Sequence, residues 1–220
     1  MMKIGIIGAG HIGGTLARRW TQLGHQVSIA NSRGPESLGD LAAETGATPG
    51  TVQEVADGAR VVVVTIPLKN VPHLPKEVFH HLPSGTVVID TCNYYPRQRD
   101  GKILAIEEGL TESRWVEQQL GHFVIKVFNN IMASHLLKNG RPAGTPGRIA
   151  LPVAGDHVLA KDTVMKLVDE LGFDAVDAGP LDQSWRQQPG TPAYVADLDA
   201  ERLRQALAQA SPERSLDWRA

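Results

Sequence analysis

The sequence contains a single cysteine, Cys92, among its 220 residues, so no internal disulfide can form. It also has no excess of charge of either sign, because 22 Lys and Arg residues face 24 Asp and Glu residues and leave a formal net charge of −2. Proteins that bind nucleic acid usually display a concentrated basic surface. We therefore expect no nucleic-acid partner, and a small neutral or anionic ligand instead.

Long apolar runs are absent as well. No stretch approaches the roughly 18 consecutive apolar residues that a membrane span requires, so we expect no membrane partner. The first residues lack the basic segment, apolar core and cleavage site of a secretory signal, and the cytoplasm is the expected location. With 42% hydrophobic residues and no linker rich in Gly and Ser, the chain is expected to form one compact body.

Short β-branched apolar runs alternate along the chain with longer amphipathic segments, a pattern typical of βαβ units and a parallel sheet. The apolar runs lack strict polar alternation, as strands covered on both faces should. We predict strands at 3–7, 26–30, 60–66, 86–90, 123–128, 149–154 and 174–177. We predict helices at 12–23, 36–45, 51–56, 76–82, 133–138, 158–171 and 198–208. Thr51 and Glu54 are predicted to form a capping box.

The expected fold class is α/β: a doubly wound, mostly parallel sheet (Rossmann fold) with a smaller C-terminal α/β extension that closes the cleft. We place the Rossmann domain at 1–132 and the extension, with substrate-side loops and a terminal helix, at 133–220. Two stretches rich in Gly and Pro, 140–147 and 187–192, are interpreted as ordered loops over an active cleft, with ordinary surface loops as the alternative. From Ser211 onward we expect a loosely held tail.

The run Gly8-Ala9-Gly10-His11-Ile12-Gly13 places the pattern G-x-G-x-x-G between the first predicted strand and the first predicted helix. In this position the first glycine makes a tight turn, the second lets the backbone approach a pyrophosphate, and the third lets the helix pack on the strand. The free N–H groups at the start of the helix then face the phosphates. All six residues are predicted to bind a dinucleotide, with His11 as part of the groove wall and not as a base.

The second predicted strand ends in Asn31-Ser32-Arg33, without the carboxylate that accepts hydrogen bonds from the ribose hydroxyls of NAD. A carboxylate would repel a 2′-phosphate, whereas a hydroxyl and a guanidinium can donate to it. We therefore predict NADP(H) as the cofactor, bound by Asn31, Ser32 and Arg33. The alternative is that Arg33 is a solvated loop residue.

The ends of two later strands are also predicted to line the cofactor groove. Thr65, Ile66 and Pro67 follow the run of valines that ends at Val64, and Asn93 follows the next predicted strand. In an open α/β sheet the carboxyl ends of the strands face the ligand crevice. Ile66 and Pro67 are expected beside the nicotinamide ribose.

From residue 3 to residue 181 the chain resembles the coenzyme F420-dependent NADP oxidoreductase family. The motifs that carry the resemblance are, in order, the glycine turn, Asn31-Ser32-Arg33, Thr65-Ile66-Pro67, Val127-Phe128-Asn129-Asn130 and the run from Gly172 to Leu181. The resemblance implies hydride exchange between NADPH and a deazaflavin or flavin-like ring, with coenzyme F420 or a flavin as the second substrate. It assigns Ser32 and Arg33 to the 2′-phosphate, and Gly8, Gly10 and Gly13 to the phosphate turn. Residues 182–194 depart from the charged helix that members using F420 tend to have, which leaves the acceptor open.

Hydride transfer between two rings needs close positioning in a dry slot and no ionised side chain. A carbonyl or imine acceptor would need a nearby donor. Tyr94, Asn129 and His135 are the catalytic candidates for that role, and Tyr94, Asn129 and Trp185 are the candidate contacts to the substrate, a small-molecule hydride acceptor. The alternatives are a packed turn for Tyr94, a locally satisfied helix residue for His135, and a core or subunit contact for Trp185.

The sequence offers no metal site, because His73, His80 and His81 lack a third ligand at close helical spacing. Cys92 is expected to pack and not to act as a nucleophile. Three functions stay open: an NADPH-dependent reductase of a flavin-like acceptor, an NADPH-dependent reductase of a small carbonyl or imine, and a sensor that binds NADP(H) without turnover.

Rossmann enzymes of this size are often dimers, so a homodimer is a further expectation. The last predicted helix has apolar positions at Leu203, Ala206 and Leu207. These positions could pack within the chain or across a two-fold axis, and the pattern does not choose between the two.

Overall fold

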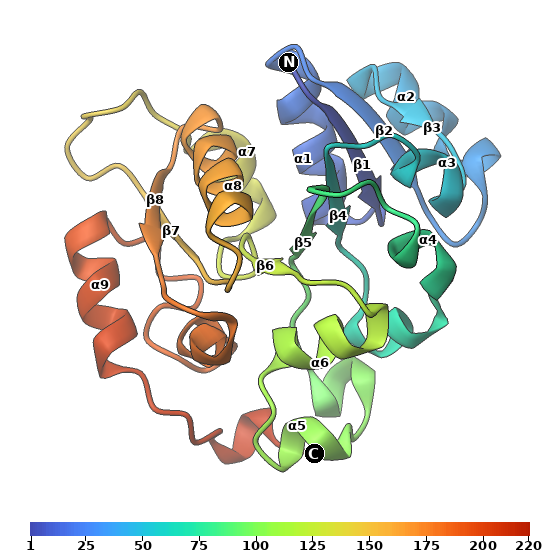
Figure 1. The fold of residues 1–220 in the computed structure, drawn as a ribbon. Helices are drawn as coiled ribbons and strands as arrows, with labels where there is room; N and C mark the ends of the chain where they lie inside the picture. The colour runs from blue at the N-terminus through green and yellow to red at the C-terminus, as the bar shows by residue number, and fades with distance from the viewer.

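The computed structural model describes all 220 residues, and its main element is a six-stranded parallel sheet (Figure 1). The strand order is β3-β2-β1-β4-β5-β6. The strands are β1 (Lys3–Ile7), β2 (Gln26–Ala30), β3 (Thr48–Pro49), β4 (Val61–Val64), β5 (Val87–Asp90) and β6 (Ile125–Lys126). From β1 the chain builds the sheet outward through β2 and β3 on one side, and then through β4, β5 and β6 on the other. The strand order therefore reverses between β1 and β4. An open α/β sheet forms its ligand crevice at such a point.

Helices cover both faces of this sheet. They are α1 (His11–Gln22), α2 (Gly39–Thr45), α3 (Val52–Ala56), α4 (Lys76–His80), α5 (Leu104–Glu107), α6 (Glu112–Leu120), α7 (Ala133–Lys138) and α8 (Val158–Glu170). Because side chains alternate along a strand, Val61 and Val63 of β4 join the apolar cluster on the α1 and α8 face, and Val62 and Val64 join the cluster on the α4 and α6 face. This double burial explains why the strand is a continuous run of valine.

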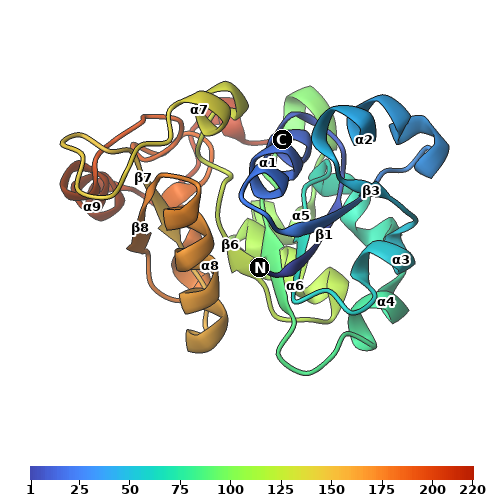
Figure 2. The ribbon, with the colours of Figure 1, turned by 90° about the horizontal axis from the view of Figure 1, so that it is seen from above.

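The C-terminal part adds a second, two-stranded parallel sheet made of β7 (Ala150–Val153) and β8 (Asp174–Asp177). Helix α8 lies between the two sheets and contacts both (Figures 1 and 2). An antiparallel bridge between Lys126 and Ala154 joins them directly. Helix α9 (Ala200–Gln209) covers the outer face of the small sheet. The division into 1–132 and 133–220 follows this arrangement, and we retain it as a proposal.

The predicted fold class, a Rossmann-type α/β sheet, is confirmed. The bounds of β1, β2, α7 and β8 agree with the prediction, and the Thr51 and Glu54 capping box is present at the start of α3. Strand β6 is only two residues long, against the six predicted from 123 to 128. It ends early because Phe128 adopts a left-handed conformation, with φ of 62°, which an extended strand cannot continue.

Two helices, α5 and α6, were not predicted. Helix α6 carries ordinary end signals, since the Thr111 hydroxyl accepts from Arg114 N–H at its start and Gly121 ends it in the left-handed region. The buried face of α6 includes the polar residues Glu112 and Ser113. The apolar residues of the helix therefore do not show the regular helical spacing by which helices were predicted from the sequence.

Residues 140–147 do not lie over the crevice, which corrects one prediction. Arg141 N–H donates to Gly172 O at 2.8 Å, and a Cβ added to Gly140 would lie 3.0 Å from Nη2 of Arg19. Arg19 is in the last turn of α1. Because α1 begins at the glycine turn, its last turn lies at the amino ends of the strands, on the side of the sheet away from the crevice.

The tail after Ser211 is held in place, which corrects a second prediction. Arg214 donates to Glu112 Oε1 and to Gln188 Oε1, both at 2.7 Å, and the ring of Trp218 packs 5.9 Å from that of Tyr95. The tail therefore runs back over the Rossmann part, and Figure 1 shows the C-terminus beside α5.

The apolar face of α9 packs within the chain. Leu203, Ala206 and Leu207 share a small cluster with Ala150 of β7 and Val176 of β8. These side chains are therefore not available to a two-fold interface. None of the helices combines the length and apolar character that crossing a bilayer requires.

Candidate functional site

A cleft of about 640 Å³ lies at the carboxyl ends of β1, β2 and β4, a size suited to a small ligand. It brings together most of the residues predicted to bind the cofactor: Gly8, Ala9, Gly10, Asn31, Ser32, Arg33, Thr65, Ile66 and Pro67. His11 lies just outside, in a neighbouring hollow between α1, α2 and α7 that also contains Ala9 and Gly10. Gly13 lies behind the turn, and Asn93 stands at the end of β5.

The glycine turn is shaped by close backbone contacts. Gly8 has φ of 121°, and a Cβ there would lie 2.1 Å from Thr65 O. A Cβ at Gly13 would lie 1.9 Å from Gly8 O, so this glycine lets α1 approach β1. Gly10, by contrast, has no atom within 4 Å of an added Cβ. The space over Gly10 opens to the cleft, as the approach of a pyrophosphate would require.

The start of α1 offers donors to this space. Gly10 is the N-cap residue, and no side chain caps the helix. The first N–H groups of an α-helix have no partner within the helix, so those of His11, Ile12 and Gly13 are free to bind an anion. The turn therefore fits the pyrophosphate of a dinucleotide.

The loop after β2 presents a free guanidinium. Asn31 Oδ1 accepts from Arg33 N–H at 2.9 Å, and Asn31 Nδ2 donates to Ser37 Oγ at 2.8 Å, so Asn31 shapes the turn. Ser32 and Arg33 are exposed at the edge of the cleft, and the Arg33 side chain takes part in none of the hydrogen bonds or ion pairs of the structure. The carboxylate nearest in sequence, Glu36, lies against Gly34.

The opposite wall of the cleft was not predicted. Val52, Asn70, His73, Leu74 and Pro75 all line it, most of them in or after the 3-10 helix Leu68–His73. Pro67 precedes this helix, and Pro72 and Pro75 stiffen its end. The prolines predicted a turn after β4. They did not indicate that the segment after this turn lies along the cleft.

Beyond the cleft, the ends of β5 and β6 are tied together by side-chain amides. Asn93 Nδ2 donates to Asn129 O at 2.8 Å, and Asn129 Nδ2 donates to Asn93 Oδ1 at 3.1 Å. Asn129 also exchanges hydrogen bonds with Gln187, which is completely buried. This places the 187–192 loop next to the ends of both strands, on the side of the sheet that holds the cleft.

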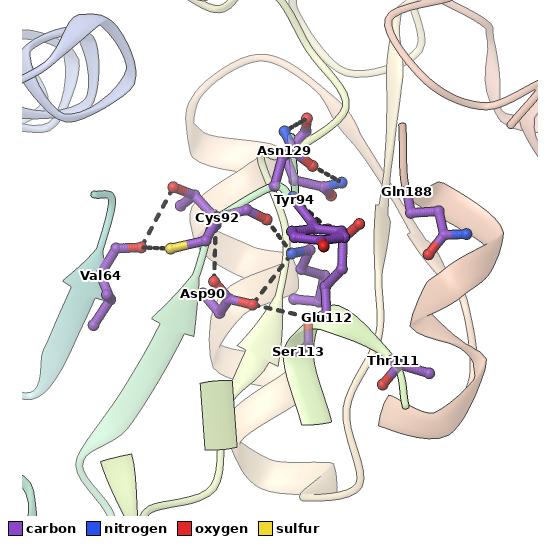
Figure 3. A network of polar contacts seen from close by, with 12 residues as sticks. Val64, Asp90, Cys92, Tyr94, Thr111, Glu112, Ser113, Asn129 and Gln188 are labelled. Atoms are coloured by element: carbon purple, nitrogen blue, oxygen red, sulfur yellow. Dashed lines mark hydrogen bonds and ion pairs between the residues drawn. The ribbon is translucent and has the colours of Figure 1, made fainter. Parts of the chain in front are cut away.

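A buried ion pair supports the turn that carries Asn93. Lys126 Nζ lies 3.2 Å from Asp90 Oδ2 and donates to Cys92 O. Asp90 also accepts from Cys92 N–H and Ser113 Oγ, both at 2.8 Å (Figure 3). Burial by itself would lower the pKa of Lys126, but the carboxylates of Asp90 and Glu112 outweigh it and raise that pKa. Lys126 is therefore held in its protonated form beside Asp90.

Cys92 packs in this turn and has no sign of activation. Its side chain is 3% exposed, and burial raises the pKa of its thiol well above the usual value, with the Asp90 charge adding to the effect. A thiol nucleophile needs the opposite shift. No group of three or more His, Cys, Asp or Glu side chains in the chain could hold a metal ion.

The positions of Tyr94 and Trp185 argue against their predicted contact with an acceptor. Tyr94 is fully buried, and its hydroxyl donates to Glu107 at 2.9 Å and accepts from Ile103 N–H at 3.0 Å. Burial raises the pKa of Tyr94 to about 12. Trp185 lies under the Arg186 guanidinium, on a hollow that shares no residue with the cofactor cleft. The burial of Tyr94 agrees with the alternative interpretation of this residue, a packed turn.

His135 lies on α7, where its Nδ1 contacts a carboxylate oxygen of Asp197. Its neighbours Ala133, Ser134 and Leu137 line the hollow beside Gly10 and His11, but His135 does not. The partner is not a local one, because Asp197 lies beyond β8 in the chain, but it gives His135 a contact other than an acceptor. Of the three catalytic candidates, only Asn129 stands at the strand ends beside Asn93.

The chain is similar to several known proteins. Residues 3–94 match the family described as NADP oxidoreductase, coenzyme F420-dependent. The hypothetical protein SMa0349 of Sinorhizobium meliloti is 30% identical, with a TM-score of 0.74 over 90% of this chain and 95% of its own. A protein of Arthrobacter sp. FB24, provisionally assigned as an F420-dependent NADP reductase, is 25% identical, with a TM-score of 0.69 over 84% of this chain and 87% of its own.

A shorter match links the chain to YjhV of Escherichia coli K12, at 46% identity over 69 residues. That match spans 31% of this chain and half the length of YjhV. The SMa0349 likeness, in contrast, runs over nearly the whole of both chains. The chain therefore belongs to the coenzyme F420-dependent NADP oxidoreductase family and is an NAD(P)-dependent oxidoreductase.

Proposed function

We propose that the protein uses NADP(H) and transfers a hydride between NADPH and a deazaflavin or flavin-like acceptor. The observation that carries the choice of NADP(H) is Arg33, whose free guanidinium stands at the end of β2 beside the glycine turn. No carboxylate occupies the strand end where an NAD-binding fold places one. A guanidinium can donate two parallel hydrogen bonds to a phosphate.

The nucleotide, when bound, supplies a hydride from C4 of its nicotinamide. The residues of the chain bind and orient it: the glycine turn and the start of α1 would hold the pyrophosphate, and Ser32 and Arg33 the 2′-phosphate. Ile66 and Pro67 line the cleft on the β4 side. The acceptor would then approach from the ends of β5 and β6, near Asn93 and Asn129. Ring-to-ring transfer of this kind depends chiefly on positioning.

The cofactor assignment is tested by titrating NADPH and NADH into the wild type and into Arg33→Ala. A hydrogen bond to a charged group contributes roughly 1.5–3 kcal/mol, so we expect NADPH affinity to fall about 10- to 150-fold in the variant while NADH affinity is unchanged. Glu36→Gln is the matched control, because it changes the charge of the same loop without removing the phosphate contact. Equal NADPH affinity in wild type and Arg33→Ala would refute the assignment.

The acceptor is tested by following the nicotinamide absorbance of NADPH with coenzyme F420, FMN, FAD and a panel of carbonyls and imines in turn. We expect oxidation with the ring acceptors. Oxidation by a carbonyl or imine alone would make the protein a reductase of small molecules. Binding of NADPH without oxidation by any of them would support a sensor.

A further inference from the structure

Two tyrosines, Tyr95 and Tyr194, meet on the side of the sheet where the acceptor is proposed to approach. Tyr95 follows β5, Tyr194 follows the 3-10 helix Leu181–Gln187, and their hydroxyl groups are hydrogen-bonded to each other. Both side chains are half-buried. The ring of Trp218 packs 5.9 Å from Tyr95 and 6.2 Å from Tyr194, so the two phenols are held in place.

The pair is connected to the wall of the cofactor cleft. Asp100 accepts from Tyr95 N–H at 2.8 Å and from Lys69 N–H at 3.3 Å. Lys69 belongs to the same 3-10 helix as Asn70 and His73, which line the cleft. Asn93 Nδ2 reaches Tyr95 Oη at 3.3 Å. The phenols therefore stand beside the strand ends where the acceptor is proposed to approach.

The direction of the hydrogen bonds in this region is set by backbone carbonyls, which can only accept. The end of the Gln187 amide that lies 3.2 Å from Pro152 O must be its nitrogen, Nε2, because the carbonyl needs a donor. The same Nε2 donates to Asn129 Oδ1 at 2.9 Å. Asn129 Nδ2 donates to Gln187 O at 2.8 Å and to Asn93 Oδ1 at 3.1 Å. The orientation of each amide is thus fixed by the one before it.

The last amide of the series fixes the role of Tyr95. Asn93 Nδ2 donates to Asn129 O and to Tyr95 Oη, so Tyr95 Oη accepts from Asn93. The two phenols hold two protons, and their mutual hydrogen bond uses one. Tyr95 Oη already has two partners, whereas Tyr194 Oη has only Tyr95. With Tyr95 as the donor of that bond, the proton of Tyr194 has no protein acceptor.

We propose that Tyr95 donates to Tyr194 and that Tyr194 donates a hydrogen bond to the hydride acceptor, at the end of the series Gln187, Asn129, Asn93 and Tyr95. The inference rests on the proposed function and narrows the acceptor to a molecule with a conjugated carbonyl or imine nitrogen that gains negative charge, as flavin-like rings have. The hydride carries its electron pair from NADPH to the acceptor, so that NADP⁺ forms and the acceptor is reduced. Tyr194 keeps its proton, and the proton that completes the reduction comes from solvent.

Protonation of Tyr194 is favoured by its surroundings. Burial raises the pKa of its hydroxyl above the ordinary value for tyrosine. The phenol therefore stays a donor between about pH 6 and pH 9, well below the ordinary tyrosine pKa of about 10. A donor of this kind stabilises charge on the acceptor without titrating in that range.

The test compares Tyr194→Phe with the wild type under saturating NADPH. We expect kcat with the flavin-like acceptor to fall about 10- to 100-fold, by the same factor at each pH from about 6 to 9, while NADPH affinity is unchanged. Tyr95→Phe keeps the hydroxyl of Tyr194 but removes the hydrogen bond that holds it in position. The kcat of this variant should fall by a smaller factor. Tyr94→Phe, the same chemical change at a buried phenol outside this network, should keep the wild-type kcat.

The outcomes separate this inference from the function on which it rests. Wild-type kcat in Tyr194→Phe, together with turnover of a flavin-like acceptor by the wild type, would overturn the role of Tyr194 alone. A fall in NADPH affinity equal to the fall in kcat would also overturn it, because the residue would then act on the nucleotide. No oxidation of NADPH by the wild type with any acceptor would overturn the proposed function and this inference with it.

Discussion

Replacing Lys126 by methionine should destabilise the protein strongly, because it leaves a carboxylate in the core without its counter-charge. The side chains of Lys126 and Asp90 are 1% and 0% exposed, and their charged atoms lie 3.2 Å apart. Breaking a buried pair from one side typically costs about 3–5 kcal/mol. Ser113 and the Cys92 N–H still donate to Asp90 in the variant, so we expect the loss at the lower end of that range.

The loss is measured by urea unfolding and by thermal melting. For a chain of this size, about 3 kcal/mol corresponds to a fall in Tm of roughly 6–12 °C. The double variant Asp90→Asn/Lys126→Met removes both charges, so its loss should be smaller than the sum of the two single losses by up to about 3 kcal/mol. A loss below about 1 kcal/mol in Lys126→Met would refute the reasoning, since the pair would then contribute no more than an exposed one.

The same variant has a functional consequence. Lys126 holds the carbonyl of Cys92, and the next residue, Asn93, donates to both Asn129 and Tyr95. Loosening this turn should lower kcat for the acceptor more than it lowers NADPH affinity, because the glycine turn does not depend on it.

Three other predictions follow from contacts already described. Gly13→Ala would place a carbon 1.9 Å from Gly8 O and should weaken NADPH binding on the order of 100-fold in a fluorescence titration; unchanged affinity would contradict the packing argument. Because the pKa of Tyr94 is raised from 10.0 to about 12, the unfolded chain ionises this phenol first, so stability should be lost between these pH values. Urea unfolding should show that part of the loss in the wild type and not in Tyr94→Phe. Arg214→Met removes the 2.7 Å contact with Glu112 and should speed chymotryptic cleavage at Trp218, whereas an unchanged rate would mean that other contacts hold the tail.

The features that the sequence predicted are local ones. The glycine turn lies within six residues between a strand and a helix, and the contacts that require Gly8 and Gly13 are the ones the pattern implies. The capping box at Thr51 depends on a spacing of three residues. Strand β4 could be predicted because both of its faces are buried, and a strand buried on both faces is a continuous apolar run, here of valine.

The proposed acceptor side is different, because its contacts join residues far apart in the chain. Asn93 meets Asn129 36 residues later, and Tyr95 meets Tyr194 99 residues later. No periodicity or spacing rule relates such positions. The Lys126 and Asp90 pair was likewise invisible, since a lysine near the end of a strand usually reaches solvent.

The neighbours Tyr94 and Tyr95 show most clearly what the sequence could predict and what it could not. Both follow β5 at its carboxyl end, where the sequence predicted them. The chain is irregular after Asp90, so the two-residue alternation of a strand no longer says which ring turns inward. Packing decided it: Tyr94 fills the core under Arg214, and Tyr95 is left beside Asn93. The sequence by itself thus determined the glycine turn and the class of fold, and the tertiary structure determined which side chains meet at the ends of β5 and β6.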